Sequence, residues 1–300
     1  MRHSLTDSFV SSFRSIVLPR EHGSWSLALE PVALGLLVAP SRAGACLALA
    51  ACAGFVARRP LKLALTLPTT DPRHPTALRW LTLLTLLAAL ALAAVLTLAI
   101  LRNTQNPPAS VSSLRTVPIS GRFSVANLRI TQNWGVAALW PLALVVPFGA
   151  AFLAFDRRGE MRAAEAEICG SLAFALLPAT FATLAGWSTA PALALAAVMI
   201  TRSVPTILTV RTALRRAKGQ RAVTWPALSA ALAGVVVLTA LQRAGLVPLA
   251  AVACALGFAA RSAWLLSPAT PAWSARRIGT MEAALGLAFL ATLTVAYWLA

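Results

Sequence analysis

Nine apolar segments, each close to the roughly 20 residues that span the hydrocarbon layer of a bilayer, determine what this chain can form. They are residues 23–39, 43–57, 78–101, 134–155, 168–187, 190–210, 226–241, 245–266 and 280–299. The second segment either ends at residue 57 or continues past Arg58 and Arg59, whose long side chains would then extend toward the membrane surface. The sequence therefore predicts an all-α, polytopic transmembrane helix bundle of about nine helices.

The composition places the chain in a membrane rather than in water. Hydrophobic residues make up 58% of the sequence and charged residues only 12%, about half the charged fraction of soluble domains. The net charge of +17 would suit nucleic acid if it formed one basic face on a soluble domain. Here the basic residues occupy short gaps between apolar segments, where they act as topology signals and meet anionic lipids. The expected partner is the lipid bilayer, and no nucleic acid is expected.

Cysteine and histidine give no sign of a metal or a cofactor. The four cysteines lie in or beside apolar segments without metal-ligand spacing: Cys46, Cys52, Cys169 and Cys254. Of the three histidines, only His22 borders a membrane segment, so haem ligation by two histidines within the bilayer is not expected. No cofactor and no metal site is therefore predicted.

The positions of tryptophan and of charge both support nine membrane segments, and the charge also indicates their orientation. Tryptophan prefers the membrane–water boundary, and seven of the nine lie at segment ends: Trp25, Trp80, Trp134, Trp187, Trp225, Trp264 and Trp298. With the amino terminus inside, eighteen Lys and Arg residues fall on the inner side, six on the outer side and two within helices. This bias predicts a multi-pass protein of the bacterial inner membrane with a cytoplasmic amino terminus and an external carboxyl terminus.

The chain divides into a short amino-terminal segment and one membrane domain. In residues 1–22, one helical face carries Leu5, Phe9, Phe13, Ile16 and Val17, which predicts a cytoplasmic amphipathic helix on the membrane surface, with a disordered tail as the alternative. Residues 23–300 form a single transmembrane domain. Within it, residues 102–133 are rich in Asn, Ser, Pro and Arg and predict a long external loop.

Charged residues inside apolar segments are the main candidates for function. Glu30 and Arg202 lie well inside such segments, where each needs a counter-ion, another polar group or water. We expect them either to line a cavity open to the cytoplasm or to form a structural ion pair between helices. Glu165, Glu167 and Glu282 lie near segment starts, where the partial charge of a helix amino terminus explains an acid.

Basic clusters follow the second and sixth segments. Arg211, Arg215 and Lys218 share one face at helical spacing close to the membrane, which suits a phosphate or diphosphate head group. The positive-inside rule would place the same residues there. Asp156 and Glu160 have a spacing that suits a hard cation, but the arginines around them favour charge compensation within the hairpin.

Three stretches carry a resemblance to a known family. Pro19-Arg20-Glu21-His22-Gly23-Ser24-Trp25, with Glu30-Pro31 after it, resembles the signature of the YwiC-like family of bacterial membrane proteins. Phe55-Val56-Ala57-Arg58-Arg59-Pro60-Leu61 and residues 165–170 also resemble recurring stretches of that family. The resemblance implies a membrane topology but no catalytic residues.

A more distant likeness is to the UbiA-type intramembrane prenyltransferases, which also have nine helices and a cytoplasmic amino end. Their reaction uses magnesium held by two Asp-rich motifs in the loops after helices two and six. Here the loop after the second segment contains a single acid, Asp71, and the loop after the sixth segment contains none. The likeness thus implies a UbiA-like helical arrangement without the magnesium-dependent reaction.

Three functions are compatible with these features. The first is binding of an amphipathic or anionic ligand (isoprenoid, quinone or lipid) in a cytoplasm-facing polar cavity, with or without catalysis. The residues expected to hold its polar head are Glu21, His22, Glu30, Arg58, Arg59, Arg202, Arg211 and Arg215. The second is transport of a small anion or metabolite with Glu30 and Arg202 midway, and the third is a structural role in a membrane complex.

Overall fold

The computed structural model describes residue 16 and residues 22–105, 135–161 and 163–300, with residues 22–27 and 103–105 described by their backbone alone. The predicted amphipathic helix in residues 1–22 and the predicted loop at 102–133 lie almost wholly outside these ranges. All regular structure in the described ranges is helical. In chain order the elements are α2 (His22–Val38), α3 (Arg42–Thr66), α4 (Arg73–Gln105), η3 (Gly135–Leu139), α6 (Leu142–Arg157), α7 (Ala164–Ala175), α8 (Leu177–Leu184), α9 (Thr189–Ala217), α10 (Trp225–Arg243), α11 (Leu249–Leu265) and α12 (Ala275–Leu299).

The helices confirm the predicted polytopic bundle. In the described ranges, seven helical stretches are long and apolar enough to cross a membrane, and two shorter apolar helices cover Ala28–Val38 and Leu249–Leu265. Counted together, they correspond to the nine apolar segments of the sequence. One of the seven stretches contains both α7 and α8, and another contains η3 and α6. The second helix continues through Arg58 and Arg59 to Thr66, which decides between the two alternatives for its end.

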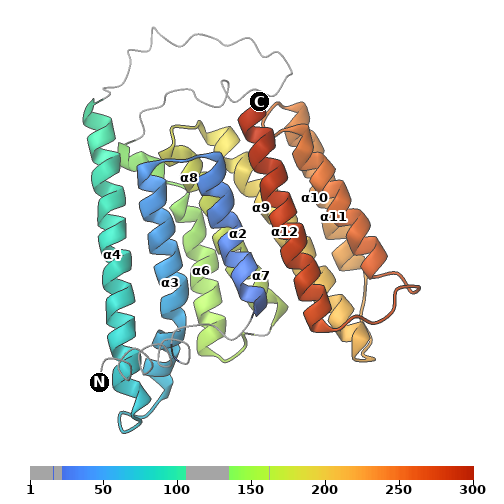
Figure 1. Cartoon of the computed structure of the whole chain (residues 1–300), viewed down its shortest axis with the longest axis horizontal. Helices are drawn as coiled ribbons and strands as arrows, with labels where there is room; N and C mark the ends of the chain where they lie inside the picture. Colours follow the sequence, from blue (N-terminus) through green and yellow to red (C-terminus); the bar gives the residue numbers. More distant parts are fainter. Residues whose placement is uncertain (1–15, 17–21, 106–134, 162) are drawn as a thin grey trace, which may run out of the picture.

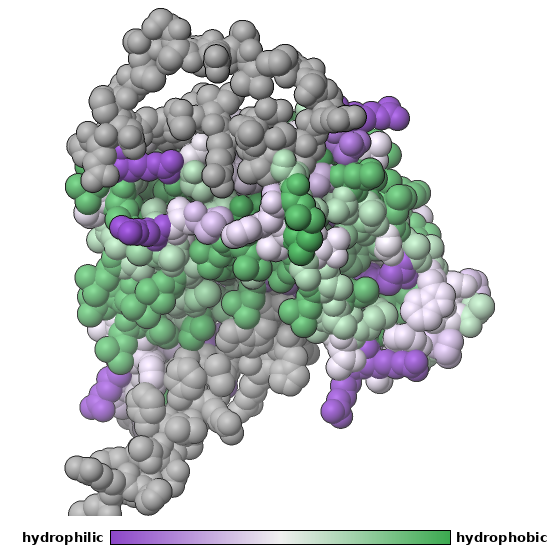
Figure 2. All heavy atoms as spheres, turned by 45° about the horizontal axis from the view of Figure 1, so that its top comes forward, coloured by the Kyte–Doolittle hydropathy of each residue, from purple (hydrophilic) through white to green (hydrophobic). Residues whose placement is uncertain are grey.

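The helices lie side by side and run in alternating directions across one bundle (Figure 1). The α3–α4 hairpin forms one edge of the view, and α10 and α11 form the other. The largest buried cluster lies between α2, α8, α9 and α12, where Leu34, Trp187, Leu195 and Met199 are at most 1% exposed. Figure 2 shows hydrophobic residues over much of the visible outer surface between more polar ends, as expected for a surface that meets lipid.

One face of the bundle carries most of the described basic residues. On this face, which we call the basic face, α3, α6, α9 and α11 end and α4, α7, α10 and α12 begin (Figure 1). Its Lys and Arg residues are Arg58, Arg59, Lys62, Arg73, Arg79, Arg157, Arg158, Arg211, Arg215, Arg216, Lys218, Arg221, Arg276 and Arg277. Near the opposite face, the described chain has Arg42, Arg102 and Arg243. The charge asymmetry of the sequence thus corresponds to two ends of one bundle.

Phe181 of α8 joins the first helices to the centre of the bundle. Its side chain is fully buried, and it packs in a cluster with Val32, Leu47 and Val95. A Cβ atom placed on Gly35 of α2 would collide with the Phe181 ring. The glycine is therefore what allows α2 to approach α8 this closely.

Candidate functional site

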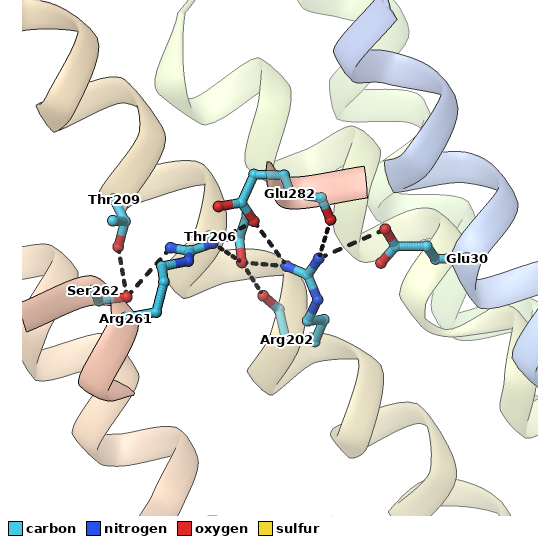
Figure 3. A network of polar contacts seen from close by, with 7 residues as sticks. All are labelled: Glu30, Arg202, Thr206, Thr209, Arg261, Ser262 and Glu282. Carbon is cyan, nitrogen blue, oxygen red and sulfur yellow. Dashed lines mark hydrogen bonds and ion pairs between the residues drawn. The ribbon is translucent and has the colours of Figure 1, made fainter. Parts of the chain in front are cut away.

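A network of four buried charged side chains joins α2, α9, α11 and α12 inside the membrane-spanning part of the bundle. Its members are Glu30 of α2, Arg202 of α9, Arg261 of α11 and Glu282 of α12 (Figure 3). None of the four residues is more than 9% exposed. Two guanidinium groups and two carboxylates give the network no formal net charge, which is the arrangement that buried ions require.

Arg202 lies at the centre of this network and touches three helices. Its Nη2 is 3.6 Å from Oε1 of Glu30 and donates to the backbone carbonyl of Glu282 at 3.5 Å. Its Nη1 is 3.6 Å from Oε2 of Glu282 and donates to the hydroxyl of Thr206, one turn further along α9. The guanidinium carbon also stands 4.3 Å from the centre of the Phe258 ring, close enough for a cation–π contact.

Arg261 and a group of hydroxyls complete the network on the side of α11. Arg261 donates to Oε2 of Glu282 in the closest contact of the network and to the hydroxyl of Thr206 at 3.4 Å. Its other terminal nitrogen donates to Ser262, which in turn accepts from Thr209 at 3.0 Å. Glu282 therefore interacts with both arginines, whereas Glu30 reaches only one of them.

Gly286 of α12 makes the position of Glu30 possible. A Cβ atom at residue 286 would overlap the carboxyl group of Glu30, so only glycine leaves room for that carboxylate against the backbone of α12. The place of the Glu30 carboxyl group against α12 thus depends on one residue without a side chain.

Glu30 and Arg202, which the sequence predicts either to line a cavity or to form a structural ion pair, do form an ion pair between α2 and α9. Neither residue lines the cavity described below, and whether the pair has only a structural role stays a prediction. The simple helix-terminus explanation for Glu282 is wrong, because this residue lies about two turns into α12 and is 8% exposed. Arg261 was missed as a site residue. Its signal was the same as that of Arg202, an arginine well inside an apolar segment.

A cavity of about 1330 Å³ lies between the α3–α4 hairpin and the α6–α7 pair. Its walls are largely apolar and include three phenylalanines, Phe55, Phe152 and Phe174. The other uncharged lining residues of α3, α4, α6, α7 and α8 are Ala51, Gly54, Ala57, Leu61, Leu81, Thr85, Val145, Gly149, Leu153, Gly170, Ser171, Ala173 and Leu177. Cβ atoms built on Gly54 and Gly149 meet no atom within 4 Å, so both glycines face open space.

Four cations and one carboxylate line the cavity at the basic face: Arg58, Glu167, Arg211, Arg215 and Lys218. Arg211 pairs with Glu167 at 2.9 Å. One cavity thus has a charged end and apolar walls, which is typical of a binding site for an amphipathic molecule.

Arg58 is held in place by three neighbours. Its Nε is 3.5 Å from Asp156, its Nη2 donates to the sulfur of Met161 at 3.1 Å, and its guanidinium carbon is 4.6 Å from the centre of the Phe152 ring. Asp156 also pairs with Lys62 at 3.2 Å. Among the described residues, the partners of Asp156 are therefore on α3, and neither Arg157 nor Arg158 of the hairpin pairs with it.

Arg215 and Lys218 differ from the other cations of the cavity. Within the described ranges, neither side chain has an ion pair or a hydrogen bond to the protein, whereas Arg58 and Arg211 each pair with a carboxylate. Two positive charges at the polar end of an apolar chamber thus have no counter-ion in the part of the chain that the structure describes. An anion is the ligand that such a pair would bind.

The predicted ligand residues fall into separate groups. Arg58, Arg211 and Arg215 line the cavity, together with Lys218, which the predicted ligand set did not include. Arg59 has an interaction of its own and is not among the lining residues, and Glu30 and Arg202 belong to the buried network and not to the lining. The side chains of Glu21 and His22 lie outside the described residues. Among the described residues, no group of three or more His, Cys, Asp or Glu side chains is placed to hold a metal.

The membrane-spanning helices and the buried charges define a polytopic, integral membrane protein of the all-helical class. Comparison with protein families agrees: the model of the family described as YwiC-like protein matches residues 18–105, which contain α2, α3 and α4. This match confirms the resemblance seen around residues 19–25 and 55–61, while residues 165–170 lie beyond it. No curated protein and no solved structure matches the chain.

Proposed function

We propose that this protein binds an amphipathic ligand, an isoprenoid, a quinone or another lipid, in the cavity between the α3–α4 hairpin and α6–α7. The observation that carries the proposal is the combination of an apolar chamber of about 1330 Å³ with four cations at one end. Ligand sites commonly measure about 300–1,000 Å³, so this chamber has room for a lipid-sized molecule. The apolar part of the ligand lies among the phenylalanines, and its head lies against the cations.

The charges favour an anionic head group within this class. Glu167 compensates Arg211, but Arg215 and Lys218 have no partner among the described residues. A neutral head group would leave these two charges uncompensated, whereas a phosphate or a carboxylate accepts hydrogen bonds from both. Recognition by arginine and lysine needs no metal ion.

We further propose that the protein lies in the bacterial inner membrane with its basic face, and hence its amino terminus, in the cytoplasm. The support is the positive-inside rule, applied to the basic residues that gather where α3, α6, α9 and α11 end. The head group then lies at the level of the inner leaflet, whose own anionic lipids meet the same face.

Native mass spectrometry of the gently purified protein tests the proposal. The wild-type protein should carry a non-covalent lipid-sized mass, and the double variant Arg215→Gln with Lys218→Gln should lose most of it while remaining folded. Arg243→Gln is the matched control, because Arg243 is exposed near the opposite face. An equal retained mass in the double variant and in the control would contradict an anionic head at this end of the cavity.

Transport of a small anion or metabolite is the second candidate, and the buried network favours it. Charged residues inside spans often mark a transport path, and transporters often contain interrupted helices. The fifth span is interrupted at Leu176, between α7 and α8. Single cysteines placed along α2 and α9 and labelled from each side of the membrane distinguish the candidates. A transporter should admit reagent from both sides, whereas a binding protein should admit it only from the basic face.

A further inference from the structure

The buried network contains two carboxylates that are held very differently. Glu282 accepts from Arg261, lies 3.6 Å from Arg202 and also offers Arg202 its backbone carbonyl. Glu30 has one ion pair within the described chain, the 3.6 Å approach to Arg202, and no hydrogen bond. Figure 3 shows this difference: Glu30 stands at the end of the network, joined to it by a single line.

Arg202 does not depend on Glu30 in return. Its terminal nitrogens reach Thr206 and Glu282, and its guanidinium lies over Phe258. If Glu30 lost its charge, Arg202 would keep these partners. The network would then carry one net positive charge, and the Phe258 ring would still stabilise the guanidinium of Arg202. The reverse does not hold, because a charged Glu30 without Arg202 would have no counter-ion.

A carboxylate without hydrogen bonds is costly inside a membrane-spanning segment, and the neutral acid costs far less. The charged side chains that act on Glu30 from the described part of the chain are Arg202 on α9 and Glu282 on α12. The 3.6 Å approach of Arg202 stabilises the carboxylate, whereas burial between the helices is unfavourable for a charge. Arg261 on α11 is engaged with Glu282 and does not reach Glu30.

We propose that Glu30 is a proton-binding site. In the deprotonated state its carboxylate pairs with Arg202 and ties α2 to α9. On binding a proton from water, the neutral acid releases Arg202, which stays with Glu282 and Thr206. This site is separate from the cavity between the α3–α4 hairpin and α6–α7, so the two proposals stand or fall independently.

Infrared spectroscopy of the purified protein tests this proposal directly, because a protonated carboxyl group has a C=O stretching band distinct from that of a carboxylate. The chain has nine Asp and Glu residues, so the signal of Glu30 is the carboxylic acid band in the difference between the wild-type and Glu30→Gln spectra, and this band should grow as the pH falls. Glu167→Gln, at the rim of the cavity, should keep the band and serves as the control. A wild-type acid band equal to that of Glu30→Gln at every pH at which both proteins are folded would overturn the proposal.

A second variant keeps the test decisive if Glu30→Gln folds poorly. Glu30→Asp retains the ionisable group but moves it away from Arg202. The pH at which the band reaches half its height should therefore shift by at least half a pH unit, which corresponds to about 0.7 kcal/mol. An unshifted midpoint in Glu30→Asp would assign the band to another residue and overturn the proposal.

Discussion

Gly286→Ala is the substitution that most directly measures how strongly Glu30 is held. The added methyl group would occupy the place of the Glu30 carboxyl group. Because that group is the end of a flexible side chain, it should swing away and lose its 3.6 Å approach to Arg202. The substitution therefore removes an ion pair without changing either charged residue.

The expected loss of unfolding free energy follows from the geometry of the ion pair. Two unit charges 3.6 Å apart attract by about 5 kcal/mol at an effective dielectric constant of about 20. The cost of removing both charges from water offsets much of this attraction, and Arg202 keeps its other partners. The greater helix propensity of alanine returns about 0.5–1 kcal/mol. We therefore expect Gly286→Ala to lower the free energy of unfolding by about 1–3 kcal/mol.

The assay is unfolding in mixed detergent micelles, followed by the fluorescence of the tryptophans, of which Trp187 is 1% exposed. Gly257→Ala on α11 is the control, because a Cβ atom there meets nothing within 4 Å. This control should be unchanged or slightly more stable. In a Glu30→Gln background, the cost of Gly286→Ala should fall by at least half, since no ion pair remains to be lost. Equal costs in both backgrounds would refute the ionic explanation.

Two further predictions concern the packing of α2 and the rim of the cavity. Gly35→Ala should lower the free energy of unfolding by about 1–3 kcal/mol, because its methyl group collides with the buried ring of Phe181; unchanged stability in chemical unfolding would contradict this close approach. Asp156→Asn should change stability by less than about 1 kcal/mol, since its partners Arg58 and Lys62 are partly exposed. A loss of several kcal/mol in the same assay would show that Asp156 holds α6 to α3.

The helices were predictable from the sequence because a membrane span must satisfy its backbone hydrogen bonds within itself and must be apolar for about 20 residues. The end of the second helix was harder to predict. Arg58, Arg59 and Lys62 were compatible with an end at residue 57 or with continuation past them, and the helix continues to Thr66. Long basic side chains can leave the apolar layer while their backbone stays helical, so charge alone does not end a span.

The buried charges were recognisable from the sequence, but their partners were not. Glu30 and Arg202 stood out because charge is costly in an apolar segment. Glu282 and Arg261 join them only because α11 and α12 pack beside α9, which no local pattern reports. The cavity has the same origin: its walls come from helices far apart in sequence, and its size depends on glycines and alanines that leave space.

The measurement that tests the central claim most directly fills the cavity. Gly54→Leu and Gly149→Leu place a side chain into the open space between α3 and α6, whereas Gly257→Leu adds the same side chain on α11, outside the cavity. In native mass spectrometry, both cavity variants should lose the bound lipid-sized mass that the wild type and Gly257→Leu retain. A mass retained undiminished when both cavity glycines are replaced together would contradict binding in this chamber.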